Sequence, residues 1–342
     1  MSIETATLDG AIAPSENTHL FGHDSAQAFL AQSYRSGKGH HAILIEGPEG
    51  IGKATLAFRF TNHVLNHPEP QDAPDALEDP DPASPVFRQI AGGASHNLLH
   101  LSRPADAKTG KLKSAITVDE IRRAGKFFSQ TSGTGNWRIV IVDTADEMNR
   151  AAANAVLKIL EEPPKRALFL MLSHAPGKLL PTIRSRCLPL TLRPLSEADL
   201  LASLAQLGIG LDAAIADRVL ALSGGSVSQA IKLVNYGGLE ILAAFDTVLT
   251  QKGPTQRKAM HKLADVVTQK DRETLFSFFT EHLSEHVTHE ARSAALAGDV
   301  QRAYRLSMLQ RAVTDRFATS DAYNLDRKQT VLSALTDLAA AV

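Results

Sequence analysis

Three residues in the first fifth of the chain have the types and spacing of a phosphate-binding loop. Gly47, Gly52 and Lys53 fit the pattern G-x-x-x-x-G-K, in which glycines let the backbone approach phosphates and the lysine reaches the terminal phosphate groups. The pattern continues with Ser or Thr, whose hydroxyl binds magnesium, but this chain has Ala54. Thr55 does not replace that hydroxyl, because one residue turns a helix by about 100°. The residues predicted to surround a nucleotide are Gly47, Pro48, Gly50, Gly52, Lys53, Ala54 and Thr55.

A carboxylate farther along the chain completes the nucleotide-binding pattern. Asp143 ends the β-branched run 138–143, where it would hold magnesium through water. Hydrolysis also needs a group that polarises the attacking water, and Thr144, directly after the aspartate, does this poorly. Asp146 and Glu147 lie roughly 10 Å farther along an extended chain, so we expect them to cap a helix or to be exposed. Hydrolysis at this site is therefore predicted to be weak or absent.

The elements that position these residues read as a parallel α/β sheet. Short apolar or β-branched runs, typical of buried strands, occupy residues 42–45, 97–101, 138–143, 167–172 and 188–192. Helical periodicity separates them, at residues 23–36, 53–62, 117–129, 150–162 and, as a short helical or turn segment, 178–186. This alternation predicts an α/β domain over residues 1–193, with helices on both faces of the sheet.

One segment interrupts this rhythm. Residues 67–85 contain six prolines and six acidic side chains. Such a composition does not favour a regular helix or strand, so we expect a mobile surface excursion.

After Pro194 only helical periodicity remains. Three amphipathic segments (196–207, 212–223 and 226–236) predict a small helical domain over residues 194–238, followed by an all-α domain over residues 239–342. The second helical domain either forms one bundle around its own core or also packs one edge against like bundles in a ring. The sequence leaves both open. The predicted fold class is α/β plus all-α.

The composition is that of an ordinary soluble protein. The 342 residues predict roughly two or three domains. Lys plus Arg number 36 against 37 for Asp plus Glu, so any DNA contact needs a local patch. One such patch comprises Arg103, Lys108, Lys111 and Lys113, which either touch phosphates or are merely solvated. A single cysteine, no secretory signal and no long apolar run favour a cytoplasmic protein.

Three stretches resemble the clamp-loader branch of the AAA+ ATPases, which serves bacterial DNA polymerase III. They are residues 47–53, residues 142–164 with the run ANAVLKILEEPP, and the triplet Ser185, Arg186, Cys187. The paired His40 and His41 before the first strand and residues 324–326 at the last helix match in order as well. The resemblance covers the whole chain. It implies an AAA+ nucleotide-fold domain, a three-helix lid and a C-terminal helical collar.

The resemblance implies a catalytic role in trans for the triplet. Arg186 would enter the ATP site of a neighbouring subunit as an arginine finger, with Ser185 and Cys187 beside it. A planar cation beside the γ-phosphate stabilises the charge of the transition state. The alternative for Arg186 is an ordinary surface salt bridge, and Cys187 is expected to be a small buried side chain rather than a nucleophile.

Departures from the family pattern favour a non-motor subunit. Motor subunits carry a lid arginine where this chain has Ser228, and many relatives carry a four-cysteine zinc module that is missing here. Together with Ala54 and Thr144, the serine at position 228 implies that the chain is a stator. It would join motor and delta subunits in a pentameric ring that loads the sliding clamp onto primed DNA. The chain would then be part of a nucleotidyltransferase holoenzyme without being the polymerase itself. Lys53 leaves ATP or ADP binding open, with magnesium weak or absent and no zinc.

Two alternatives stay open from the sequence. The chain could be a self-sufficient ATPase, the motor subunit of the same loader. It could also be a structural AAA+ scaffold that has neither activity nor a finger.

Overall fold

The chain folds into two compact units, Met1–Ala230 and Ile231–Val342. The structure is a computed structural model that describes residues 7–105, 112–129 and 135–341. Lys108 and Lys111 of the basic patch lie outside the described residues. The division into three domains stays a prediction.

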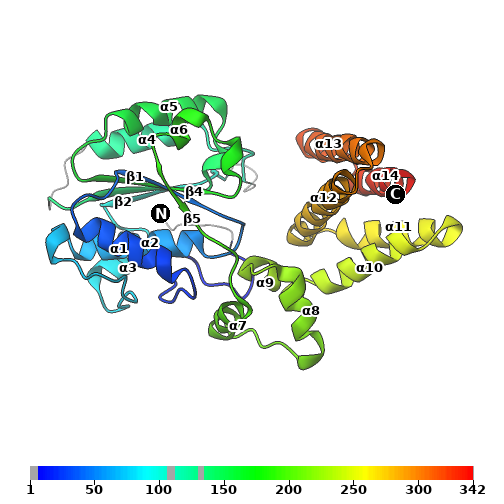
Figure 1. Ribbon diagram of the computed structural model, residues 1–342, viewed down its shortest axis with the longest axis horizontal. Coiled ribbons are helices and arrows are strands. Elements are labelled where there is room, and N and C mark those ends of the chain that lie inside the picture. The colour runs from blue at the N-terminus through cyan, green and yellow to red at the C-terminus, as the bar shows by residue number, and fades with distance from the viewer. Residues whose placement is uncertain (1–6, 106–111, 130–134, 342) are drawn as a thin grey trace. The chain divides into compact units, whose positions relative to one another are not determined.

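The first unit is built on a five-stranded parallel sheet (Figure 1). Its strands are β1 (Ala42–Glu46), β2 (Leu98–Leu101), β3 (Arg138–Val142), β4 (Ala167–Ser173) and β5 (Leu188–Thr191), in the order β2-β3-β4-β1-β5. All five predicted strands are confirmed. Because β1 lies between β4 and β5, the loop that follows it leaves from inside the sheet, where the carboxyl ends of several strands converge.

Helices cover both faces of this sheet, as predicted (Figure 1). One face carries α1 (Asp24–Arg35), α2 (Lys53–Asn66) and α3 (Pro85–Ala91), and the other carries α4 (Val118–Ser129), α5 (Arg150–Glu161) and α6 (Pro181–Arg184). Successive strand residues point to opposite faces, so Ile43 and Ile45 join one core cluster while Leu44 joins the other. Helix α3 was not predicted, although Ser84 followed by a proline at the first helical position is a helix-start signal.

The remaining helices also follow the predicted periodicity. They are α7 (Glu197–Gln206), α8 (Ala213–Ser223), α9 (Val227–Asn235), α10 (Gly238–Thr250), α11 (Gly253–Val267), α12 (Glu273–Leu296), α13 (Val300–Tyr323) and α14 (Arg327–Ala341). The border between the units falls within α9. The second unit has its own core, in which Phe245 and Phe279 are fully buried. None of the described helices is long and apolar enough to cross a membrane.

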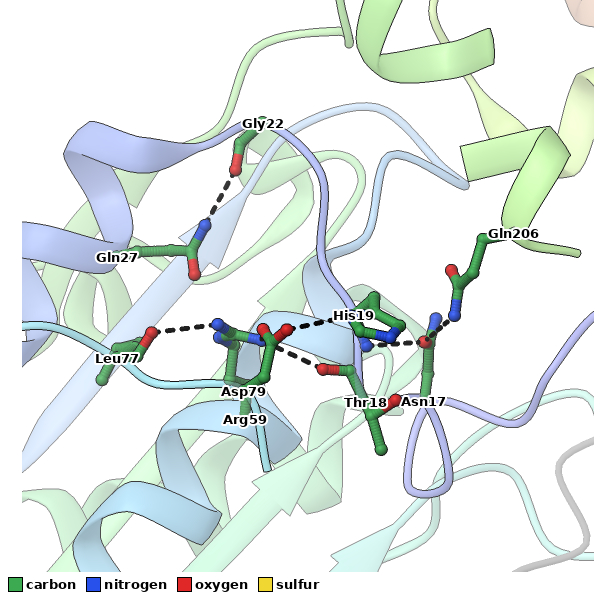
Figure 2. A network of polar contacts seen from close by, with 9 residues as sticks. All are labelled: Asn17, Thr18, His19, Gly22, Gln27, Arg59, Leu77, Asp79 and Gln206. Carbon is green, nitrogen blue, oxygen red and sulfur yellow. Dashed lines mark hydrogen bonds and ion pairs between the residues drawn. The ribbon is translucent and has the colours of Figure 1, made fainter. Parts of the chain in front are cut away.

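The structure corrects the expectation for residues 67–85. This segment contains a 3-10 turn at Pro70–Asp72, and Ala73 and Leu77 are buried in the core cluster of α1 and α2. Figure 2 shows how its backbone and Asp79 meet Arg59 of α2: Leu77 O accepts from Nη2 at 2.9 Å, and Asp79 Oδ1 lies 2.6 Å from Nη1. Prolines prevent a long helix or strand here, but two buried apolar side chains and the ion pairs of Asp79 with Arg59 and of Glu69 with Arg166 fasten the segment to the domain.

Candidate functional site

Lys53 is the first residue of α2. Its ammonium group, which the sequence predicts to reach nucleotide phosphates, is bound to backbone carbonyl groups of its own loop. Nζ donates to Gly47 O at 2.7 Å and also to Pro48 O. The side chain is only 4% exposed. Burial lowers the Lys53 pKa to about 8, against the opposing effect of nearby carboxylates, of which Asp143 is the strongest. The lysine therefore stabilises the closed loop through two carbonyl groups.

The start of α9 packs against the same loop. Ser226 Oγ donates to Glu49 O at 2.8 Å, and Val227 N donates to Gly50 O at 2.9 Å. Gly50 has a φ of 73°, and a Cβ added there would overlap the hydroxyl oxygens of Ser226 and Ser228. Glycine is thus required at position 50 both for its left-handed backbone and for the contact with α9.

Asp143 follows β3 at the carboxyl edge of the sheet, and its carboxylate faces protein groups. His100 Nε2 of the adjacent strand β2 lies 3.6 Å from Oδ2, and Thr144 Oγ1 donates to Oδ1 at 3.3 Å. Burial alone would raise the pKa of Asp143, but the nearby His100, together with His174 and the Thr144 hydroxyl, outweighs it and lowers that pKa. His100 was missed from the sequence. The sequence signal that could have identified it is that His100 is the one polar residue in the strand run LLHL.

Asp146 has a different role from the predicted cap or exposed pair. It lies in a 3-10 turn, Ala145–Glu147, and its Oδ2 accepts from the backbone N–H groups of His174 and Ala175, both at 3.2 Å. The prediction was wrong because the partners come from the end of β4, far along the chain. Glu147 pairs with Arg103, whose Nε lies 2.9 Å from Oε2. One cation of the basic patch is thus bound within the domain.

Arg186 lies just after α6, a helix on the sheet face opposite α2 (Figure 1). Its Nη2 lies 2.7 Å from Glu161 Oε1 of α5, and its Nη1 donates to Thr182 O at 3.0 Å. Ser185 Oγ donates to the same carbonyl at 3.2 Å. About a third of the Arg186 side chain, 35%, remains exposed. The finger candidate therefore forms a surface ion pair on its own chain and remains accessible.

Cys187, the third residue of the triplet, is buried. Its Sγ lies 3.7 Å from Met171 Sδ, and burial raises the pKa of the thiol to about 11. At neutral pH the side chain is therefore a neutral thiol, which is a poor nucleophile. The expectation of a small buried side chain is confirmed.

The structure gathers the candidate residues into two separate groups. Gly47, Pro48, Gly50, Lys53 and Asp143 lie at the carboxyl edge of the sheet, between the loop after β1 and the turn after β3. Arg186 belongs to the second group, with Ser185 and Cys187, on the opposite face.

A family model described as "DNA polymerase III, delta subunit" matches residues 22–196, just over half of the chain. The chain belongs to this family. The match spans the sheet, the phosphate loop and the Ser185, Arg186, Cys187 triplet, so the resemblance seen in the sequence is confirmed over the first domain.

Individual members of the DNA polymerase III delta subunit family agree with this placement. The delta-prime subunit of Pseudomonas aeruginosa is 33% identical over 215 residues, 62% of this chain and 61% of that protein. The delta-prime subunit of Escherichia coli is 31% identical over 60% of this chain and 57% of its own length. Matches thus span about three fifths of these relatives. A gamma subunit-related protein of Thermotoga maritima superposes over 92% of this chain at 18% identity and a TM-score of 0.40.

Proposed function

We propose that this chain is a stator subunit of the DNA polymerase III clamp loader. It would assemble with motor and delta subunits in a pentameric ring, help place the sliding clamp on primed DNA, and supply Arg186 to the ATP site of a neighbour. One contrast carries the proposal. The chain's own loop lysine is bound to protein carbonyl groups, whereas Arg186 lies at the surface.

The contacts at the phosphate loop support weak or absent ATP hydrolysis by the chain itself. Lys53 bonds to Gly47 O, and the Ser228 hydroxyl occupies the space beside Gly50. Ala54 has no hydroxyl for magnesium, and the position after Asp143 is a threonine. A magnesium–nucleotide complex would have to displace the lysine from both carbonyls and still lack one ligand. We therefore assign no catalytic step to this loop.

The placement of Arg186 supports a role in trans. A guanidinium keeps its charge at all physiological pH values and offers paired donors, which suits a phosphate group. Its intrachain partner Glu161 is half exposed, so the pair is solvated and releases the arginine at small cost. An arginine finger contributes on the order of 10³ to 10⁵ in rate.

The second unit supports assembly into a ring. Val300, Tyr304 and Met308 follow one another at intervals of four residues on α13 and are 73%, 66% and 49% exposed. Leu296 at the end of α12 is 81% exposed. Consecutive exposed apolar side chains on one helix face are typical of a protein interface. They favour the ring alternative for this bundle over a bundle that packs only on itself.

The test is a loader reconstituted from this chain and its partner subunits, assayed for DNA-stimulated ATP hydrolysis. Arg186→Ala should lower the rate at least about a thousandfold, the lower end of the range for a lost arginine finger. Glu161→Ala is the matched control, because it breaks the same intrachain ion pair but leaves the guanidinium in place. If both variants lose the rate, or neither does, Arg186 does not act as an arginine finger. An unchanged rate with Arg186→Ala would favour the scaffold alternative.

The motor alternative is tested on the isolated chain. Lys53→Ala should not change the very low rate of ATP turnover expected for the wild-type protein, since Lys53 is engaged by the loop. Substantial turnover that collapses with this substitution would show that the chain is a motor.

A further inference from the structure

A cavity in the first unit takes no part in the proposed function. It has a volume of about 190 Å³ and lies where α1 meets the starts of β1 and β4, at the opposite end of the strands from the phosphate loop. Its lining includes His40 with His41 and Pro163 with Pro164, two pairs that belong to the stretches by which the sequence resembles its family. Neither pair has a role at the loop or at Arg186.

Aromatic rings form much of the cavity wall. Tyr34 packs edge-to-face against Phe60, with ring centroids 6.2 Å apart, and against Trp137, with centroids 5.6 Å apart. The imidazoles of His40 and His41 stack with centroids 4.5 Å apart. Aromatic rings attract further rings in these offset and perpendicular arrangements. A ring placed among these five would extend an aromatic cluster that already exists.

The polar groups of the Tyr34 and Trp137 rings are already used by the protein. Tyr34 Oη donates to His67 O at 2.5 Å, and Trp137 Nε1 donates to Pro68 O at 3.0 Å. These bonds leave the ring faces available but not the hydroxyl or the indole N–H. A ligand with many hydrogen-bonding groups, such as a nucleobase, would lose its water contacts here with little in return.

A cation at the rim favours a ring over an aliphatic group. Arg166 lines the cavity, and its guanidinium is held by Gly135 O at 2.8 Å and Glu69 Oε1 at 2.6 Å. A guanidinium fixed in this way attracts the face of an aromatic ring but not a saturated chain. Burial lowers the pKa of His41, so its imidazole adds no second charge at neutral pH.

We propose that this cavity is a binding site for a single uncharged aromatic ring. The size agrees, because an apolar protein cavity of about 150 Å³ accommodates benzene and this one is slightly larger. The ring would come from a small molecule or from a phenylalanine side chain of a polypeptide. This inference does not depend on the proposed function.

The experiment uses Trp137, the single tryptophan of the chain, as the reporter. The full-length protein is titrated with toluene while the Trp137 indole N–H resonance is followed by NMR. We expect a saturable shift with toluene and none with methylcyclohexane, which has nearly the same shape without the ring electrons. N-acetyl-phenylalaninamide forms a third arm. A shift with this compound assigns the ring to a polypeptide, and a shift with toluene alone assigns it to a small molecule. Equal binding of methylcyclohexane, or no shift with any probe, would overturn the proposal.

Two variants tie the signal to the cavity. Gly39 lines the cavity, and a Cβ added there would meet nothing closer than 3.6 Å, so Gly39→Leu should fill the mouth without backbone strain. We expect it to weaken toluene binding by about tenfold or more, because the new side chain takes the space of the ring. Gly125→Leu on α4, where the added Cβ also has room, should bind toluene like the wild type. If Gly39→Leu does not fold, Ser33→Leu on α1 replaces it as a cavity-filling variant. Unchanged binding in the folded filling variant would also overturn the proposal.

Discussion

At the scale of single residues, side chains of the same charge have different roles that depend on their neighbours. Lys53 and Arg186 are both cations for which the sequence predicts phosphate contacts. The first is buried and bound to Gly47 O, and the second is one third exposed and paired with a half-exposed carboxylate. Burial and partner therefore separate a structural lysine from an accessible surface arginine, as the proposed role in trans requires.

His63 gives a pH prediction at this scale. It is buried among aromatic rings on α2, and burial lowers its pKa from 6.5 to about 4. The unfolded chain therefore binds a proton that the folded chain resists, and stability falls as the pH drops from about 6.5 to about 4. His63→Leu should remove this contribution, up to about 3 kcal/mol. The measurement is the free energy of unfolding in urea across this pH window.

The control for His63 is an exposed histidine. His96→Leu should leave the pH dependence as it is in the wild type, because His96 is exposed. Identical slopes for the wild type and His63→Leu would show that His63 titrates normally.

At the scale of elements, the segment 67–85 shows how irregular chain is held in place. Asp79 joins His19, whose Nδ1 lies 2.9 Å from Oδ2, to the buried guanidinium of Arg59 (Figure 2). Asn17 Oδ1 continues the network to Gln206 of α7. Residues 17–19 and the 67–85 segment thus meet at Arg59 on the helix that follows the phosphate loop, and the network extends from Asn17 to α7.

Removing Asp79 tests this attachment. Asp79→Ala leaves the Arg59 guanidinium buried with carbonyl partners only. We expect a loss of about 1 to 2 kcal/mol, less than for a fully buried pair because Asp79 is half exposed. Asp75→Ala, an exposed acidic position in the same segment, is the control and should be near neutral. Equal unfolding midpoints in urea for the wild type and Asp79→Ala would contradict the proposed attachment.

The contact between the phosphate loop and α9 gives a second prediction at this scale. Gly50 and Gly37 both have left-handed backbones, with φ of 73° and 67°. Only at Gly50 would a Cβ overlap other atoms, those of Ser226 and Ser228. Gly50→Ala should therefore destabilise the protein by at least about 1 kcal/mol more than Gly37→Ala, which reports backbone strain alone. Equal melting temperatures for the two variants would show that the contact is not tight.

At the scale of the whole molecule, the proposed assembly depends on the apolar side chains that the second unit leaves exposed. Combining Val300→Ser with Tyr304→Ser should weaken incorporation of the chain into the reconstituted loader by about tenfold or more, since each residue would lose roughly 1 kcal/mol of apolar burial at the interface. The melting temperature of the free chain should not fall, because both side chains are exposed. Size-exclusion chromatography of the mixed subunits measures incorporation. Leu222→Ser, an exposed leucine on α8, is the control. Normal incorporation of the double variant would show that this face of α13 is not part of the assembly interface.

The order of elements was determined by the sequence itself. Strand runs, amphipathic helices and the glycine pattern at residues 47–53 are local signals, and the five strands and nearly all helices follow them. The triplet around Arg186 was equally visible, because it is a short contiguous motif.

Only the tertiary structure decided which groups meet. Asp143 meets His100 of the adjacent strand, Lys53 bonds to carbonyl groups of its own loop, and Arg186 pairs with Glu161 on another helix. These partners are set by strand order and helix packing, which bring distant residues together without leaving a periodic trace in the chain. The physical reason is that hydrogen bonds and ion pairs act over a few ångströms in space, whatever the separation in sequence.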